Sequence, residues 1–428
     1  MNLIADIFPY KSLTREDKAE SWILIFAIYL IPFLQYTGLL PSVVTLLGTN
    51  VVSLCLLVLL WLSKIGRKTI FAENKILGYS VVILFFYILY TLFRSSEHYG
   101  AYEALVVFRR NFVGGLSLAF GVFYIQRFKP DCLPYVVHRI VVLCVIQSVL
   151  YIGHAMGVLH LYSGLEAKMV EGGVSVNRTY AGIPKSSEIV GCLLLWSYIQ
   201  GPQTKKLLLL GILMVAVFMT YTRSTLASTL IILILFISLL SFRKVLKVGT
   251  ITKLVLFAVM ALCVLYIIMP DSLDFWVSRF STTQAELKDD MGTYDFRQKL
   301  VDYSIDEIGY NDRMLTGMGY VHEAAKGEYS MVLGGDTLVA PVIYCEGMLG
   351  LILRIFVFVP FTLMAFNRWL HSTDRKTVAV ASLLLAAVIV NVISYMQTTY
   401  FTEYQTSLML LLVIYNWGIT KYNYIHFK

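Results

Sequence analysis

Long apolar runs alternate with short polar segments over most of the 428-residue chain. A run of about 20 apolar residues is long enough for a helix to cross ~30 Å of hydrocarbon. Twelve runs approach this length, and we expect them to form helices at roughly 21–40, 43–62, 76–93, 105–125, 135–157, 186–200, 207–222, 224–241, 254–269, 338–366, 377–397 and 404–420. The pattern therefore predicts an all-α, polytopic membrane protein with about 12 transmembrane helices.

Two polar segments, 158–185 and 270–337, are much longer than the other connections. Loops of the second length are usually functional or contain secondary structure of their own. Helical spacing in that loop relates Arg297, Leu300, Val301, Ser304, Ile305 and Ile308. We therefore expect an amphipathic helix there, which lies on the membrane surface or caps a cavity.

The long second loop divides the chain into three parts. Residues 1–269 are expected to hold transmembrane helices 1–9, residues 270–337 to form the large loop, and residues 338–428 to hold helices 10–12. No internal repeat is present, which counts against transporters that are built from matched halves.

The distribution of charge predicts the orientation of the helices. Only 14% of the residues are charged and 58% are hydrophobic, compared with roughly 25% charged residues in soluble domains. If the N-terminus is cytoplasmic, most Lys and Arg residues fall in short cytoplasmic segments, as the positive-inside rule describes. Both termini are therefore predicted to be cytoplasmic and both long segments to be on the opposite side. The net charge of +8 is explained by the lipid bilayer, not by nucleic acid.

Arg223 interrupts two apolar runs in FMTYTRSTLASTL, near the predicted outer face of the membrane. A cation at that depth is costly, so it usually faces a polar cavity or an anion. The alternative is an arginine that marks a helix end and extends its charged group to the interface. Arg178 and Arg297 belong to the two long segments on the same side. If these three arginines converge, they can bind a diphosphate, because guanidinium groups match phosphate oxygens and keep their charge.

Asp336 lies in GGDTLVAPVIYCEGMLG, where the chain re-enters the bilayer. A carboxylate there can accept a proton from a substrate hydroxyl as a general base. The alternative is a helix N-cap, since Asp follows two glycines and precedes an apolar run. Glu346 and Glu188 are expected to be structural hydrogen-bonding partners. No metal-binding histidine spacing, phosphate-binding loop or dinucleotide fingerprint occurs, so no cofactor or metal is expected.

Three short motifs occur in order along residues 175–355. They are TYTRSTLAS around Arg223, FRQKL around Arg297 followed by LTGMGY, and Asp336-Thr337 followed after nine residues by GMLG. In this order they resemble the bacterial O-antigen polymerases and O-antigen ligases, which are membrane glycosyltransferases of the GT-C type. The ligases have a histidine, their proposed base, where this chain has Asp336. The resemblance therefore favours the more variable polymerases.

The resemblance implies a polymerase that joins repeat units carried on undecaprenyl diphosphate at the periplasmic face of the inner membrane. Arg223 and Arg297 would bind the diphosphate, and Asp336 would position or deprotonate the acceptor hydroxyl. The family also implies a chain-length regulator as a partner. One alternative is an O-antigen ligase, which transfers finished glycan to lipid A core or another acceptor. Another is a flippase for lipid-linked oligosaccharides.

Overall fold

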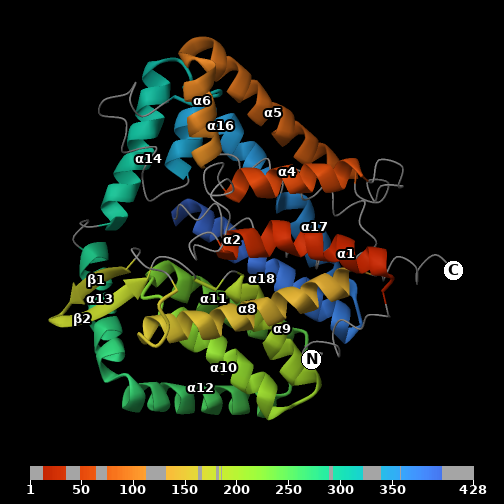
Figure 1. Ribbon diagram of the computed structural model, residues 1–428, viewed down its shortest axis with the longest axis vertical. Coiled ribbons are helices and arrows are strands. Elements are labelled where there is room, and N and C mark those ends of the chain that lie inside the picture. Colours follow the sequence, from red (N-terminus) through yellow and green to blue (C-terminus); the bar gives the residue numbers. More distant parts are fainter. Residues whose placement is uncertain are drawn as a thin grey trace.

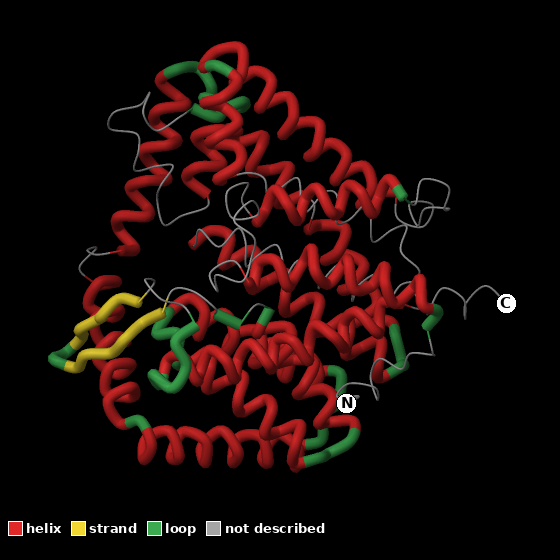
Figure 2. The backbone as a smooth tube through the Cα atoms, viewed as in Figure 1, coloured by secondary structure: helices red, strands yellow, loops and turns green. Residues whose placement is uncertain are grey.

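A computed structural model describes residues 13–34, 49–63, 75–111, 132–161, 166–179, 183–184, 186–288, 293–321, 339–356 and 358–397. Most of these residues are helical, and one two-stranded sheet projects from the edge of the molecule (Figures 1 and 2). The helical architecture agrees with the prediction from the apolar runs.

The helices follow the apolar runs closely in the middle of the chain. The described helices are α1 (Arg15–Ile25), the π-helix η1 (Phe26–Leu30), α2 (Ile31–Leu34), α4 (Thr49–Leu62), α5 (Lys75–Tyr99), α6 (Ala101–Asn111), α8 (Leu133–Ala155), α9 (Ser187–Gln200), α10 (Thr204–Phe218), α11 (Arg223–Phe242), α12 (Val248–Ile268), α13 (Pro270–Lys288), α14 (Thr293–Tyr310), α16 (Val339–Phe356), α17 (Phe358–His371) and α18 (Arg375–Gln397).

Within the described part of the chain, three helices are long and apolar enough to cross a membrane: Pro134–Ala155, Arg223–Phe242 and Val339–Phe356. Together with the helical architecture they indicate a multi-pass membrane protein, while the full set of twelve spans stays a prediction. The last predicted span, 404–420, lies outside the described residues. The run expected to form one helix at 338–366 contains α16 and most of α17, and residue 357 between them lies outside the described residues.

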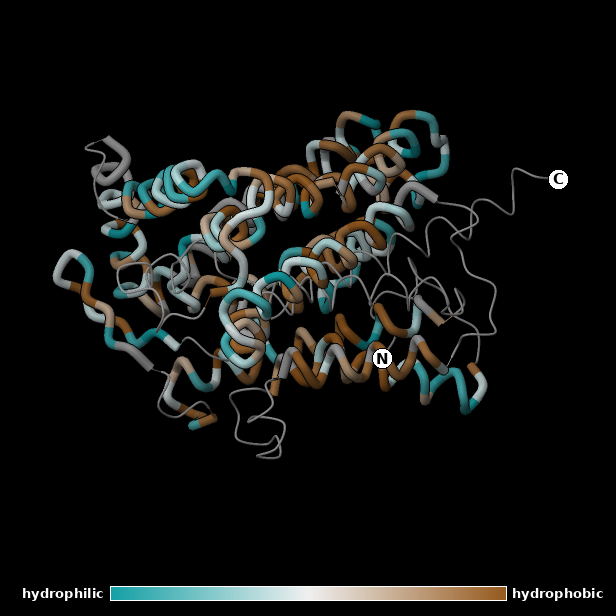
Figure 3. The backbone as a smooth tube through the Cα atoms, turned by 90° about the horizontal axis from the view of Figure 1, so that it is seen from above, coloured by the Kyte–Doolittle hydropathy of each residue, from teal (hydrophilic) through white to brown (hydrophobic). Residues whose placement is uncertain are grey.

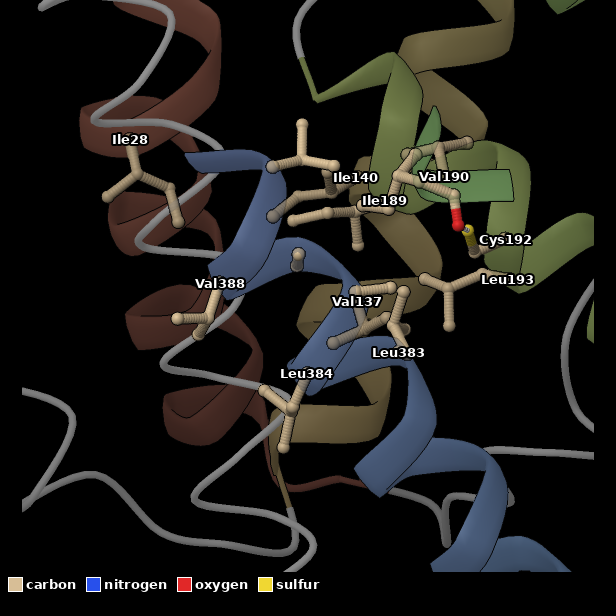
Figure 4. Close-up of a cluster of buried hydrophobic side chains, with 14 of the residues drawn as sticks. Ile28, Val137, Ile140, Ile189, Val190, Cys192, Leu193, Leu383, Leu384 and Val388 are labelled. Atoms are coloured by element: carbon tan, nitrogen blue, oxygen red, sulfur yellow. Dashed lines mark hydrogen bonds between the residues drawn. The ribbon is translucent and has the colours of Figure 1, made fainter. Parts of the chain in front are cut away.

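The interior of the bundle is built from apolar faces of α8, α9 and α18. Figure 4 shows Val137 and Ile140 of α8 beside Ile189 and Leu193 of α9, with Leu384 of α18 close by. These side chains are almost completely buried. Their close packing fixes the helices that carry the polar end of the molecule.

The outer surfaces of several helices are also apolar. On α12, the side chains of Leu256, Met260 and Ile267 are 60%, 55% and 77% exposed. Figure 3 shows apolar residues along the helices and hydrophilic residues at many of the connecting turns. Apolar side chains on the outside are what a lipid environment requires, since hydrocarbon covers them there.

The chain reverses direction between successive helices from α8 to α12. As a result, the segment between α8 and α9, the turn between α10 and α11, and the start of α13 lie at the same end of the bundle. Contacts between these segments confirm this, since Arg178 bonds to Thr222 and Trp276 bonds to Phe218. This end is at the left of Figure 1, where α13 and the sheet lie together.

An antiparallel hairpin occupies part of the first long segment, and the all-α prediction missed it. Strand β1 (Glu166–Glu171) pairs with β2 (Val174–Thr179) in a register that sets Glu171 opposite Val174. The connecting residues, Gly172 and Gly173, have φ values of 57° and 81°. A two-residue hairpin turn with positive φ at both positions strongly favours Gly-Gly.

Helix α16 is broken at Gly347, which has φ 70° and ψ −173°. The break frees the carbonyl groups of Tyr344 and Cys345, which would otherwise accept hydrogen bonds from residues one turn later. They accept instead from the backbone N–H groups of Met318 (2.7 Å) and Gly319 (2.9 Å). A segment that lies almost thirty residues earlier therefore replaces the missing helical partners.

The N–H groups on the other side of the break are satisfied by the same segment. Met348 and Leu349 donate to the carbonyl groups of Met314 (3.0 Å) and Leu315 (3.1 Å). Four backbone hydrogen bonds thus join residues 314–319 to α16. The two carbonyl groups and two N–H groups that the break in α16 exposes are therefore all paired. Such pairing is required where backbone is buried in a membrane protein.

This exchange of backbone hydrogen bonds between residues 314–319 and α16 brings the two backbones into very close contact. A Cβ atom on Gly317 would lie 2.5 Å from the backbone nitrogen of Gly347, and one on Gly347 would lie equally close to that of Gly317. Both glycines also have positive φ. Residues with side chains do not fit at either position.

Arg354 and Glu346 form a buried ion pair beside the break. The guanidinium of Arg354 donates two hydrogen bonds to the carboxylate of Glu346, at 2.8 Å and 2.5 Å, and both side chains are at most 5% exposed. The hydroxyl of Tyr320, which follows the exchanged segment, donates to the same carboxylate at 2.7 Å. Glu346 is therefore a structural partner, as the sequence predicts.

Substitution Gly347→Ala should destabilise the purified protein by at least about 2 kcal/mol, because it adds strain at positive φ and a clash with backbone. Gly249→Ala is the matched control, since a Cβ atom at Gly249 meets open space. Thermal unfolding in detergent measures both effects. Equal melting temperatures for the two variants would show that the exchange does not form.

Candidate functional site

Arg223 is the first residue of α11, directly after the turn from α10. Its guanidinium is partly buried and donates a hydrogen bond to the hydroxyl of Thr283 on α13. A cation at a helix N-terminus adds to the positive end of the helix dipole, which disfavours it. Both features make this point of the structure attractive to an anion.

Arg178 reaches the same turn from strand β2. One of its terminal nitrogens donates to the hydroxyl of Thr222 at 3.0 Å, and the other lies 3.7 Å from the sulfur of Met169. Thr222 immediately precedes Arg223 in the sequence. Arg178 and Arg223, which were selected from the sequence, therefore lie on adjoining segments.

Helix α13 is held against this turn by an aromatic cluster. Phe275 and Trp276 are buried, and the indole nitrogen of Trp276 donates to the carbonyl of Phe218 at 3.2 Å. The hydroxyls of Tyr221 and Ser272 lie 2.7 Å apart. Because buried aromatic residues contribute large contact areas, this cluster fixes the position of α13.

The docked helix places a third arginine, Arg279, at the same location. Its guanidinium donates to a carboxylate oxygen of Glu171 at 3.1 Å and lies 5.7 Å from the ring centre of Phe275. Thr282, on the next turn, donates to the second oxygen of Glu171 at 2.8 Å. Glu171 is the last residue of β1, so these bonds also attach the hairpin to α13.

We refer to Arg178, Arg223, Arg279 and Glu171 as the arginine cluster. Burial and the charge of Arg223 lower the pKa of Arg279 from its ordinary value; Glu171 opposes this shift and Arg178 adds to it. The cluster contains three guanidinium groups and one carboxylate, which bonds to Arg279, so positive charge exceeds negative charge among these four residues. Such an arrangement suits an anion that carries more than one negative charge.

Arg297 lies in the first turns of α14. The predicted amphipathic helix is confirmed there, and its buried residues Leu300, Ser304 and Ile308 face inward, with α14 packed on α16. The Nε atom of Arg297 is buried, and no described residue accepts a hydrogen bond from it. No described contact joins Arg297 to the arginine cluster, so its convergence with Arg223 stays a prediction.

Asp336 lies outside the described residues, so its predicted role as a base or N-cap remains untested by the geometry. Among the residues that the structure does describe, no group of His, Cys, Asp and Glu side chains is arranged to hold a metal ion.

Residues 208–338 match a family model, Wzy_C, described as O-antigen ligase. This segment is similar to the O-antigen ligase domain that the model describes. It spans just under a third of the chain and carries Arg223, Arg279 and Arg297, whereas Arg178 and Glu171 precede it. The resemblance that the short motifs indicate is therefore confirmed over this segment. Enzymes of this family are membrane glycosyltransferases of the ligase and polymerase type, which act on lipid-linked glycans. A comparison with curated proteins gives no match.

Sequence reasoning missed Arg279 and Glu171. The signals were present but weak: Phe275, Trp276, Arg279 and Thr283 follow helical spacing, and Gly-Gly follows Glu171 between two short runs that suit strands. Their meeting depends on the docking of the hairpin on α13, which sequence spacing alone does not show.

Gly172 lies at the hairpin tip, where a Cβ atom would clash with the side chain of Ser278 on α13. Gly172→Ala should therefore separate the hairpin from α13 and increase hydrogen–deuterium exchange in residues 166–179. Gly173→Ala is the matched control, since Gly173 also has positive φ but open space around it. Equal hydrogen–deuterium exchange in both variants would show that strain in the turn, rather than docking on α13, determines the stability of the hairpin.

Proposed function

We propose that this protein is a polysaccharide polymerase, which joins repeat units carried on undecaprenyl diphosphate at the periplasmic face of the membrane. The observation that supports this most strongly is the arginine cluster, which lies at one end of the bundle and includes Arg223 and Arg279 of the segment that matches the O-antigen ligase model. A lipid-linked diphosphate has the negative charge that such a cluster suits.

The proposed reaction transfers the growing glycan from its lipid carrier to the repeat unit of a second carrier. The bond between the anomeric carbon and the diphosphate oxygen breaks, and a bond forms from that carbon to an acceptor hydroxyl. The diphosphate leaves with the bonding electron pair, so negative charge grows on it in the transition state. Arg223, with Arg178 and Arg297, would stabilise this charge. Asp336 would receive the proton of the acceptor hydroxyl.

The partners of Arg178 and Arg223 fit this role. Each arginine donates to a threonine hydroxyl, Thr222 or Thr283, which helps to orient the guanidinium. A fixed cation in a water-poor site stabilises a developing anion more strongly than a cation in bulk water does. Fixed guanidinium groups can therefore support this chemistry without a metal or a nucleotide.

The distribution of basic residues supports a periplasmic site, since both long segments fall on the side opposite to the Lys- and Arg-rich connections. The substrates would reach the site within the bilayer, and a chain-length regulator would be a partner. Neither a nucleic acid nor a soluble nucleotide sugar is part of this proposal.

The second candidate is an O-antigen ligase, because the matched family model carries that description. It would use the same arginine cluster and the same carrier, but its acceptor would be lipid A core or another acceptor. We favour the polymerase because Asp336 occupies the position where ligases have histidine.

Arg223→Ala should reduce polymer formation on the order of 100-fold or more, since it removes charge stabilisation from the leaving diphosphate. The measurement is complementation of a polymerase-null strain, with protein levels determined in membranes. Arg313→Ala is the control, because Arg313 is an exposed arginine of the long segment 270–337, away from the arginine cluster. Normal polymer length with Arg223→Ala would contradict the proposed site.

Deletion in the native host distinguishes polymerase from ligase. Loss of a polymerase leaves single repeat units on the acceptor, whereas loss of a ligase leaves long polymer on the carrier lipid. The first result is expected. Accumulation of long carrier-linked polymer would instead support the ligase.

A further inference from the structure

Tyr221 lies in the turn between α10 and α11 with a φ value of 49°. In this left-handed conformation a Cβ atom lies too close to the following carbonyl oxygen, so glycine is the residue that usually adopts it. Three other non-glycine residues of the described chain have positive φ, and none of them is aromatic. A bulky residue keeps such a conformation only where its surroundings hold it there.

One face of α13 supplies those surroundings. The ring of Tyr221 meets the ring of Phe275 edge to face, with centroids 5.2 Å apart, and stacks on Trp276 at 6.3 Å. Its hydroxyl lies 2.7 Å from that of Ser272. Ser272, Phe275 and Trp276 are spaced by three and four residues, so they share one side of the helix. Tyr221 is only 5% exposed, so its side chain is fixed on that side.

The conformation of Tyr221 determines where the chain leads next. Only four residues separate the end of α10 at Phe218 from the start of α11 at Arg223. Tyr221 donates its N–H to the carbonyl of Phe218 at 3.4 Å, and Thr222 after it is extended, with φ −107° and ψ 111°. The guanidinium of Arg223 then donates to Thr283, also on α13. The same helix therefore holds the turn and receives the arginine that follows it.

A structural explanation is that Tyr221 is an ordinary buried aromatic residue. The backbone alone, however, would favour glycine at this position, since glycine adopts positive φ without strain. What the tyrosine ring adds is an attachment of the turn to α13, and this attachment fixes the start of α11 relative to Thr283.

We propose that Tyr221 is a positioning residue for Arg223: its ring, docked on α13, holds the turn in the left-handed conformation that places Arg223 in the arginine cluster. This inference rests on the proposed function, in which Arg223 stabilises the charge of the departing diphosphate. A catalytic group must be held in its productive geometry, because a displacement of about 1 Å can reduce the rate on the order of 100-fold.

Tyr221→Gly should remove the backbone strain but release the turn from α13. We expect it to weaken binding of inorganic pyrophosphate to the full-length protein in detergent about fivefold or more. It should also lower kcat for glycan transfer more than it raises KM, because the charge that Arg223 stabilises develops in the transition state. Tyr221→Phe keeps the ring and should stay within about threefold of the wild type in both measurements. Lys244→Gly is the matched control, since Lys244 is exposed beyond the other end of α11 and has a φ of 54°.

A double-mutant cycle separates positioning from general support of the fold. If Tyr221 acts through Arg223, Tyr221→Gly should have no further effect on pyrophosphate affinity in an Arg223→Ala background, because the arginine that it positions is gone. If Tyr221 only supports the fold, the substitution should weaken binding by the same factor in both backgrounds. Thermal unfolding identifies a misfolded Tyr221→Gly variant. Tyr221→Leu then carries the cycle with an expected loss of about threefold, because leucine keeps an apolar contact with α13 but loses the ring stacking.

Three results would overturn the inference: wild-type affinity in a folded Tyr221→Gly variant, equal losses in the two backgrounds, or a loss in Tyr221→Phe as large as that in Tyr221→Gly. Failure of the proposed function has a different signature. A protein that shows the expected coupling but forms no glycan bond from purified lipid-linked repeat units contradicts the function alone. A protein that forms polymer but loses affinity equally in both backgrounds contradicts the inference alone, and a wild-type protein that does not bind pyrophosphate contradicts both.

Discussion

A helix that breaks inside a membrane protein must find new partners for its backbone, and the structure depends on how α16 meets this requirement. Residues 314–319 supply two donors and two acceptors to the four groups that the break at Gly347 leaves open. The glycines at 317 and 347 permit the approach. These bonds attach the chain after α14 to the bundle. The aromatic contacts of α13 attach the chain before α14. The long loop is thus a part of the fold rather than an appendage to it.

The arginine cluster presents the opposite physical problem, because its three guanidinium groups repel one another. Three elements that are distant in sequence restrain it: the hairpin, the α10–α11 turn and α13. Burial of Phe275 and Trp276 provides the favourable free energy that holds α13 in place despite this repulsion. The ion pair of Glu346 and Arg354 differs in kind, since its charges balance and it lies beside the broken helix. The pair holds one cation and one anion, whereas the cluster holds three guanidinium groups and one carboxylate.

Apolar runs predicted the helices well wherever a single helix accounts for a run. The expected 186–200 and 224–241 agree with Ser187–Gln200 and Arg223–Phe242 to within two residues at each end. Helical spacing around Leu300 also predicted α14. The break at Gly347 was not predicted, because its hydrogen-bonding partners lie about thirty residues earlier in the chain. The hairpin was missed because its strands are short and mostly polar. Arg178 and Arg223 could be selected by residue type and side of the membrane, whereas Arg279 is recognisable only once α13 is docked.

The docking of α13 has a consequence for how such proteins diversify. One face of the helix is occupied by aromatic anchoring, while Val277, Phe280 and Ser281 on other faces are exposed. Exchanges at Val277 and Ser281 leave the buried Phe275 and Trp276 in place, whereas Phe280 stacks on Trp276. Substitutions at Val277 and Ser281 can therefore accumulate in small steps while the arginine cluster stays in position.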